Sequence, residues 1–333
     1  MSTSTSPVTF ADLQADFLAR VGASSNTTST AMAKKQINIA LVNMHNNPGS
    51  KFPWAERRAT LITHAPYSDG TVDIAAATRT TVSGTTTLWN TAVTGFGFNN
   101  ARIGGKMTFN GLTEVYEVSA VGGDTTITLA SVYTGDALTG ATYQYFEDEY
   151  ALAADFLRFV DLRKFSDEMN IPLIGRSEFR RNFPRNDVRG KPRCATTYTL
   201  DFAGSTTPVV KVILHPHPDD EYSIPYWYVT KYLAVTSAGV RQTYLSSDTD
   251  EPIVPYEKRY GITLYALFEY YRDYKDDVAR AQECYREYQI LMGRFLNDDD
   301  RGADKPRFVV RKRGSYRKQR FDVSNRFDDV RDR

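Results

Sequence analysis

Apolar residues recur at helical spacing near the start of the chain. The first stripe follows Thr9, a suitable helix N-cap, and stops at Gly22. The second begins after Ser29 or Thr30 and stops before residues 47–49, Asn-Pro-Gly. The two stripes consist of Phe10, Leu13, Phe17, Leu18 and Val21, and of Ile37, Ala40, Leu41 and Met44. They predict two helices within residues 1–56.

Two further helices are predicted from similar spacing. Apolar residues from Tyr150 to Leu162 indicate a helix over 150–168. The longest predicted helix runs from Ile262 to Leu296, about 50 Å at 1.5 Å per residue. Its near-heptad seam consists of Phe268, Tyr271, Tyr274, Val278, Ala281, Tyr285, Tyr288, Met292 and Phe295. A shorter helical piece is expected around residues 175–181.

Between these helices the pattern changes to short alternating runs. Of the 72 residues from Thr71 to Thr142, 17 are Thr, which favours pleated strands. Asn110-Gly111 lies between two such runs and is typical of a hairpin turn, because both residues tolerate positive φ. These features predict an all-β barrel or sandwich module. Three later strands, over 195–200, 209–214 and 222–235, are expected to form an antiparallel meander.

The predicted fold class is therefore α+β. We expect a helical bundle with a long C-terminal helix, a small antiparallel sheet and an inserted all-β module. The N-terminal helices occupy 1–56 and the β module 57–147. The remainder of the bundle spans 148–300, with the sheet at 192–235 and the long helix at 262–296. A basic tail covers 301–333.

Composition narrows the possible functions. The net charge of +1 gives no global field toward nucleic acid or membrane. No signal peptide and no apolar run of membrane-spanning length is expected. The two cysteines, Cys194 and Cys284, fit no disulfide or metal framework, so a reducing cytosol is the expected assembly compartment. No Ser/His/Asp or Cys/His arrangement indicates nucleophilic catalysis, so we expect no enzyme, catalytic residue or cofactor.

The segment from His215 to Glu221 has two interpretations. A strand followed by His-Pro-Asp-Asp-Glu resembles the zinc motif of deacetylases related to N-acetylglucosaminyl-phosphatidylinositol deacetylase. A catalytic zinc site needs three protein ligands, and that resemblance implies a downstream His, yet none of the four His follows His217. We therefore expect a Pro-Asp turn between two strands and no metal.

The C-terminal tail carries a dense run of positive charge. Residues 305–320 contain eight Lys or Arg and no acidic residue, with apolar residues interleaved. A solvated tail, contact with DNA phosphates and docking on an acidic protein are all compatible with this charge. The apolar residues favour docking. The predicted docking residues are Lys305, Arg307, Phe308, Arg311, Lys312, Arg313, Tyr316, Arg317, Lys318 and Arg320.

The aromatic seam of the long helix is expected to serve mainly the core. Four of its members are tyrosines, whose polar tips suit a partly wet interface between identical subunits. The predicted ring-interface residues are Tyr271, Tyr274, Tyr285 and Tyr288.

Several short motifs, taken in order, resemble neck proteins of tailed bacteriophages. The sheet, the Asp/Pro loop and the final helix resemble the head-to-tail adaptor family in particular. The motifs lie at residues 52–61, 67–72, 80–89, 124–135, 143, 216–228 and 248–255. The Thr-rich insert departs from the smallest adaptors.

The resemblance implies a homo-oligomeric ring, commonly of twelve subunits, seated under the portal protein. The partners would be other copies of the chain, the portal and a downstream tail or nozzle protein, with the passing genomic DNA as a further candidate and no membrane. The protein would assemble in the host cytoplasm and reside in the virion neck, between head and tail. The alternatives are another neck or tail-tube protein, and the zinc-dependent deacetylase.

Overall fold

The structure is a computed structural model that describes residues 8–46, 53–162, 171–185, 187–199 and 209–303. The chain divides into two compact units. Both chain ends, 1–55 and 232–333, contribute to the terminal unit, and residues 56–231 form the central unit. The central unit is thus inserted between two halves of the terminal unit.

Four α-helices form most of the terminal unit, and α4 lies at their centre. α4 packs against α1, α2 and α5, and nine of its residues are buried. The predicted first helix is confirmed: Thr9 and Asp12 form a capping box at its start, and Gly22 ends it in the left-handed conformation. The helices are α1 (Phe10–Val21), α2 (Thr27–Asn46), α4 (Tyr260–Asp273) and α5 (Val278–Ala303).

A small sheet and two 3-10 helices complete the terminal unit. Asp250 organises this region because its carboxylate accepts hydrogen bonds from the backbone N–H groups of Ser246 and Ser247, at 2.8 and 2.7 Å. Its carbonyl accepts from the N–H of Phe10, which anchors the start of α1. The elements are η1 (Pro53–Ala55), β14 (Ala234–Val235), β15 (Arg241–Gln242), β16 (Glu251–Pro252) and η2 (Tyr256–Lys258).

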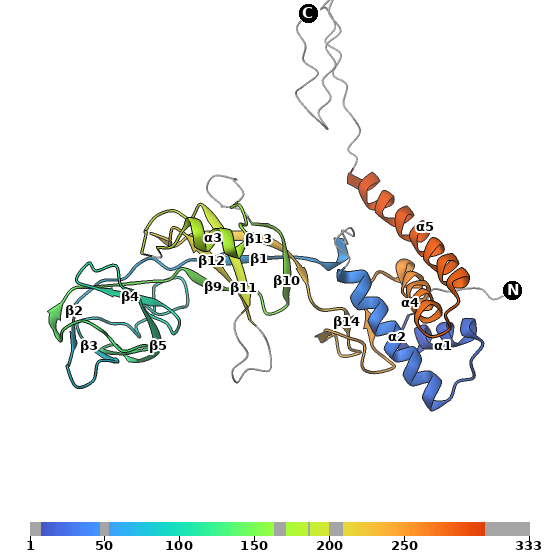
Figure 1. The fold of residues 1–333 in the computed structure, drawn as a ribbon, viewed down its shortest axis with the longest axis horizontal. Coiled ribbons are helices and arrows are strands. Elements are labelled where there is room, and N and C mark those ends of the chain that lie inside the picture. The colour runs from blue at the N-terminus through green and yellow to red at the C-terminus, as the bar shows by residue number, and fades with distance from the viewer. Residues whose placement is uncertain (1–7, 47–52, 163–170, 186, 200–208, 304–333) are drawn as a thin grey trace, which may run out of the picture. The chain divides into compact units, whose positions relative to one another are not determined.

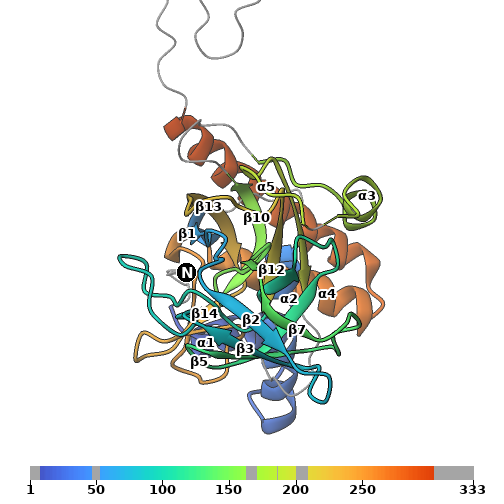
Figure 2. The ribbon, with the colours of Figure 1, turned by 90° about the vertical axis from the view of Figure 1, so that its left-hand side faces the viewer.

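The central unit contains a curled seven-stranded antiparallel sheet with the order β7-β2-β3-β6-β5-β4-β8 (Figures 1 and 2). Its two edge strands are consecutive in sequence and are separated only by Thr142. Tyr67, just before β2, also pairs with Tyr145 of β8, so the backbone of this edge strand is engaged on both sides. The strands are β2 (Thr71–Ile74), β3 (Thr81–Thr85), β4 (Lys106–Phe109), β5 (Tyr116–Gly123), β6 (Thr126–Leu129), β7 (Leu138–Ala141) and β8 (Tyr143–Phe146).

The curled sheet encloses an aromatic core. Trp89 is fully buried, and its indole N–H donates to the hydroxyl of Tyr143 at 3.0 Å. Met107, Val118 and Ile127 are also buried in this core. The predicted turn at Asn110-Gly111 is confirmed, because both residues have positive φ, 51° and 70°.

The other described residues of the central unit form two three-stranded sheets and one short helix. β13 lies between β1 and β10 in one sheet, and β12 lies between β11 and β9 in the other. Side chains such as Leu61, Val212 and Tyr226 form a shared core. The elements are β1 (Glu56–Ile62), β9 (Glu149–Ala151), β10 (Phe156–Leu162), α3 (Arg176–Asn182), β11 (Cys194–Thr199), β12 (Val210–His215) and β13 (Ser223–Thr230).

The predicted fold class is wrong. The chain is not a helical bundle with a small sheet, because helices and strands hold about equal shares and the largest element is the seven-stranded sheet. The predicted bundle loses its member over 150–168, where the described residues form β9 and β10. In β10 two register shifts interrupt the pairing with β13. These β-bulges bring Phe156, Phe159 and Leu162 to the core face at intervals of three, which resembles helical spacing.

Two other predicted elements are also corrected. The predicted three-stranded meander is wrong for its third strand. β11 pairs with β12 as predicted, but β13 belongs to a different sheet. The long helix is two helices, because the chain turns back between Tyr274 and Asp277, where Asp276 has a φ of 50°. Asp277 then accepts from the N–H of Arg280 at 3.1 Å and caps α5.

Candidate functional site

The predicted docking residues of the tail, Lys305 to Arg320, lie outside the described residues. The structure describes the element that leads into them, α5, and the α4–α5 hairpin that carries it.

The four predicted ring-interface tyrosines lie in different environments. Tyr271 and Tyr288 are buried within the terminal unit, at 8% and 5% exposed. Tyr285 is half-buried, with its ring centroid 4.8 Å from that of Phe268 on α4. Tyr274 is 55% exposed. Tyr271 and Tyr288 therefore serve the core of the hairpin, whereas Tyr274 and part of Tyr285 remain available to a neighbour.

The α4–α5 hairpin holds its aromatic residues in one interlocked cluster. Tyr265 on α4 meets Tyr288 on α5 edge-to-face, with ring centroids 5.0 Å apart. Such pairs stabilise by about 0.5–1.5 kcal/mol beyond the area they bury. Burial raises the pKa of both tyrosines above the ordinary value. Both phenols are therefore neutral at physiological pH.

α5 extends beyond its partner helix. A Cβ added to Gly261, at the start of α4, would lie 3.5 Å from both Leu291 and Met292 of α5. The start of α4 therefore lies beside residues 291–292 of α5. α5 continues to Ala303, which adds about 16 Å of helix beyond Met292 at 1.5 Å per residue. Figure 1 shows this end of α5 projecting past α4. Such a projection is suited to contact another chain.

A second candidate site is the carboxylate junction of the central unit, formed around Glu147, Asp148 and Glu149 between the curled sheet and β9. Glu147 accepts two bonds from the guanidinium of Arg102, one of them 2.9 Å from Nε to Oε1. The hydroxyl of Tyr145 donates to the same Oε1 at 2.6 Å. Burial would lower the pKa of Arg102, but the Glu147 carboxylate outweighs it and raises that pKa. Arg102 is therefore held in its charged form.

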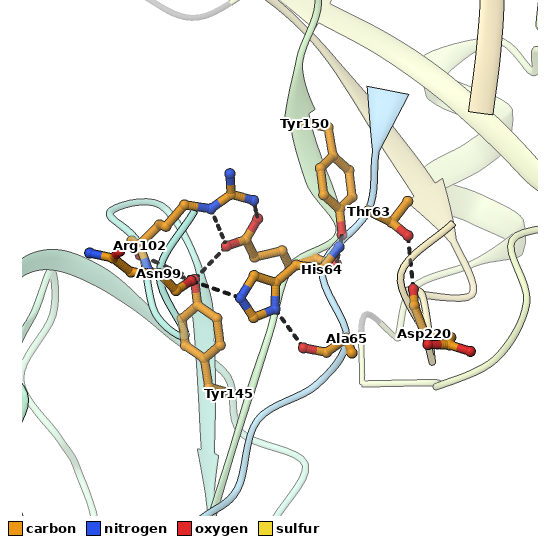
Figure 3. Close-up of polar contacts among 9 residues, drawn as sticks. Thr63, His64, Ala65, Asn99, Arg102, Tyr145, Tyr150 and Asp220 are labelled. Carbon is orange, nitrogen blue, oxygen red and sulfur yellow. Dashed lines mark hydrogen bonds and ion pairs between the residues drawn. The ribbon is translucent and has the colours of Figure 1, made fainter. Parts of the chain in front are cut away.

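His64 extends this junction to the end of β1. Its two ring nitrogens face backbone carbonyls, Nδ1 that of Ala65 and Nε2 that of Asn99, the latter at 3.0 Å (Figure 3). Its backbone N–H donates to the hydroxyl of Tyr150 at 3.2 Å. The Tyr150 hydroxyl in turn donates to the carbonyl of Glu147 at 3.0 Å. His64 is thus fixed between main-chain groups and occupies no open position from which it could act as a base.

The other two carboxylates of the junction share a buried lysine. Lys106 Nζ lies 2.7 Å from Oδ2 of Asp148 and 3.1 Å from Oε1 of Glu149. Lys211 and the hydroxyl of Tyr198 also contact Glu149. Burial would lower the pKa of Lys106, but the two carboxylates outweigh it and raise that pKa. Burial would raise the pKa of Glu149, but Lys106 and the Tyr198 hydroxyl lower it.

A cleft of about 400 Å³ borders this junction. Its walls include Leu61, Arg102, Ile103, Glu149 and Lys211. Each charged group in this wall already has a partner of opposite charge within the junction. These pairs form a charge-balanced joint that ties the curled sheet to β9 and β12.

The structure separates the two histidines of the apparent zinc motif. His215 is half-buried, and its ring lies tilted against that of Phe183, at 4.4 Å between ring centroids. His217 is 1% exposed and stacks on Phe146, at 4.3 Å. Among the described residues, no three His, Cys, Asp or Glu side chains are grouped so that they could hold a metal ion. Within the same residues, no helix is long and apolar enough to cross a membrane.

The carboxylate junction was not predicted from the sequence. Its acidic residues are consecutive, but their partners Arg102, Lys106 and Lys211 are distant in sequence. One local signal was present in Gly104-Gly105. A Cβ on Gly105 would lie 2.1 Å from the hydroxyl of Tyr145, so glycine is needed where the loop meets that ring.

Comparison of the sequence with protein-family models gives no match, and comparison with curated proteins gives none either.

Proposed function

We propose that this protein is a structural component of a tailed-bacteriophage neck, a head-to-tail adaptor without enzymatic activity. It forms a homo-oligomeric ring, commonly twelve subunits in that family, which docks on the portal and connects the DNA-filled head to the tail. It assembles in the host cytoplasm and resides in the virion. The proposal rests first on the order of the motifs that resemble neck proteins.

The observation that supports the proposal best is the projecting end of α5. The described helix runs past the start of α4 and leads directly into the basic residues 305–320. Isolated helical turns are marginal in water, so a projecting helix end gains stability from an intermolecular partner. In the proposed ring, the tail docks on an acidic surface of the portal.

The exposed part of the aromatic cluster supplies the contact between subunits. Tyr274 is exposed beside the α4–α5 turn, and Val278 and Ile290 on α5 are 56% and 46% exposed. Tyrosine is enriched at protein interfaces because it buries a large ring while its hydroxyl stays hydrated. The charge-balanced carboxylate junction suits a rigid virion subunit, because it fixes the curled sheet against β9 and β12.

Portal docking is tested with the full-length protein and a variant in which the eight basic residues of 305–320 are replaced by Gln. The portal of the same phage is immobilised, and binding is measured by surface plasmon resonance at about 50–200 mM salt. We expect the wild type to bind with an affinity that falls as salt rises. The Gln variant should bind at least tenfold more weakly.

A matched control carries three Gln substitutions at exposed basic residues of the terminal unit, Arg241, Lys275 and Arg286. It should bind the portal as the wild type does. Equal binding by all three proteins would show that the tail does not dock. Absence of wild-type binding at any salt concentration would remove the proposed portal partner altogether.

A further inference from the structure

A second concentration of positive charge lies in the central unit, far in sequence from the basic tail. Residues 176–193 contain seven basic residues, six of them arginine, and two acidic residues. This arginine patch covers α3 and the loop that leads to β11. Its charge is concentrated although the whole chain carries only +1.

Intramolecular contacts occupy part of the arginine patch. Arg185 pairs with Asp187, and Arg189 donates to the carbonyl of Asp219 at 3.2 Å. Arg176 donates to the carbonyl of Thr197 at 3.2 Å. Asp187 therefore neutralises Arg185, whereas Arg176 and Arg189 keep their charge and bond backbone carbonyls.

Three other arginines of the patch have no partner among the residues that the structure describes. Arg180, Arg181 and Arg193 are exposed, and none makes an ion pair or side-chain hydrogen bond with the described residues. Glu178 is the acidic side chain of α3, and it too is exposed. A guanidinium without an internal partner presents its full set of donors to a ligand.

A rigid support holds these three arginines together. Phe179 of α3 is 5% exposed and meets the ring of His215 edge-to-face. The ring of Phe183, just after α3, lies tilted against the same imidazole. The backbone N–H of Arg193 donates to the carbonyl of His215 at 2.9 Å. The helix and the loop therefore meet at His215, which places their arginines on neighbouring parts of the surface.

From these observations we infer that the arginine patch binds the phosphate backbone of double-stranded DNA. Arginine predominates over lysine, and its planar guanidinium matches phosphate oxygens in a bidentate geometry. Ser177 and Asn182 on α3 are exposed and add neutral donors of the kind that contact phosphates. Contacts of this type carry no base specificity. The inference is independent of ring formation and of portal docking.

The test measures binding of a fluorescent 30-base-pair duplex by anisotropy, with sodium chloride varied from about 50 to 200 mM. The full-length variant Arg180→Gln/Arg181→Gln/Arg193→Gln is compared with the wild type and with the triple Gln control in the terminal unit. Each variant loses three positive charges and retains the basic tail. Thermal unfolding checks that the variants remain folded.

We expect the patch variant to bind the duplex at least tenfold more weakly than the control at about 100 mM salt. The slope of log Kobs against log salt should fall in magnitude by about 2.7, which is 0.9 for each of three lost phosphate contacts. Equal affinities and slopes for the patch variant and the control would overturn the inference.

The competing interpretation is an acidic protein partner. Poly-L-glutamate serves as its probe in the same assay. Loss of poly-L-glutamate binding by the patch variant, with unchanged DNA binding, would also overturn the inference and assign the patch to an acidic protein.

Discussion

His217 should make the stability of the central unit depend on pH. Burial against Phe146 lowers its pKa from 6.5 to about 4, because the charged ring would lose hydration, and the positive charge of Arg189 lowers the pKa further. In the unfolded chain the ring takes up a proton near pH 6.5. The unfolded state therefore binds more protons than the folded state between pH 6.5 and 4.

The sign and the size follow from proton linkage. Stability is highest above pH 6.5, where the ring is neutral in both states, and it falls as the pH drops toward 4. A difference of about 2.5 pKa units corresponds to about 3 kcal/mol. For a unit of 150–250 residues, this lowers the melting temperature by about 6–12 °C.

The substitution His217→Phe removes the titrating group and keeps a ring against Phe146. Differential scanning calorimetry at pH 7.5 and pH 4 follows the transition of the central unit in both proteins. We expect the wild type to lose about 3 kcal/mol more than the variant between the two pH values. Other groups titrate in this range, but they are common to both proteins. Parallel pH dependence in the two proteins would refute the reasoning.

Three substitutions test the packing described above, each by thermal or denaturant unfolding. Glu147→Gln should destabilise the central unit by about 2–3 kcal/mol. This value lies between those for exposed and buried ion pairs, because its partner Arg102 is partly exposed. A loss of stability under about 0.5 kcal/mol would contradict the role of the junction. Gly105→Ala should destabilise the central unit by more than about 2 kcal/mol. Gly123→Ala should be nearly neutral, because a Cβ added there meets nothing within 4 Å. Equal losses of stability in the two variants would disprove the steric argument. Tyr288→Ala should lower the stability of the terminal unit by about 3–5 kcal/mol, because Tyr288 is buried. Tyr274 is exposed, so Tyr274→Ala should change stability little and should weaken self-association. A larger loss of stability for Tyr274→Ala than for Tyr288→Ala would contradict the assigned environments.

Local signals predicted local structure. The Thr9 cap, the Gly22 stop and the Asn110-Gly111 turn each depend on neighbouring residues, and all three occur as expected. The short helix expected near 175–181 is α3.

The wrong predictions arose where tertiary structure gives apolar residues a helix-like spacing in an element that is not one continuous helix. Two bulges in β10 place Phe156, Phe159 and Leu162 on one face of a strand, and no local residue signals them. The α4–α5 seam continues across the turn because Phe268 and Tyr285 face each other from two helices. The signal that was missed there is Asp276-Asp277. Asp276 tolerates the positive φ of the turn, and Asp277 caps the start of α5.

One candidate site has a local signal in the sequence, and the other depends on contacts between distant residues. The arginine patch was visible in the composition of residues 176–193, although the sequence could not show which arginines are paired. The carboxylate junction depends on contacts between residues 42 to 62 positions apart, such as Lys106 with Asp148 and Lys211 with Glu149. Contacts of that range follow from the topology of the sheets and not from any local pattern.

The central claim is that this protein assembles as a ring on a phage portal. The most direct measurement is negative-stain electron microscopy of the purified full-length protein mixed with the portal of the same phage. The account predicts closed rings of the protein stacked on one end of the portal. Portal particles without added density, beside a protein that remains monomeric by mass photometry, would contradict it.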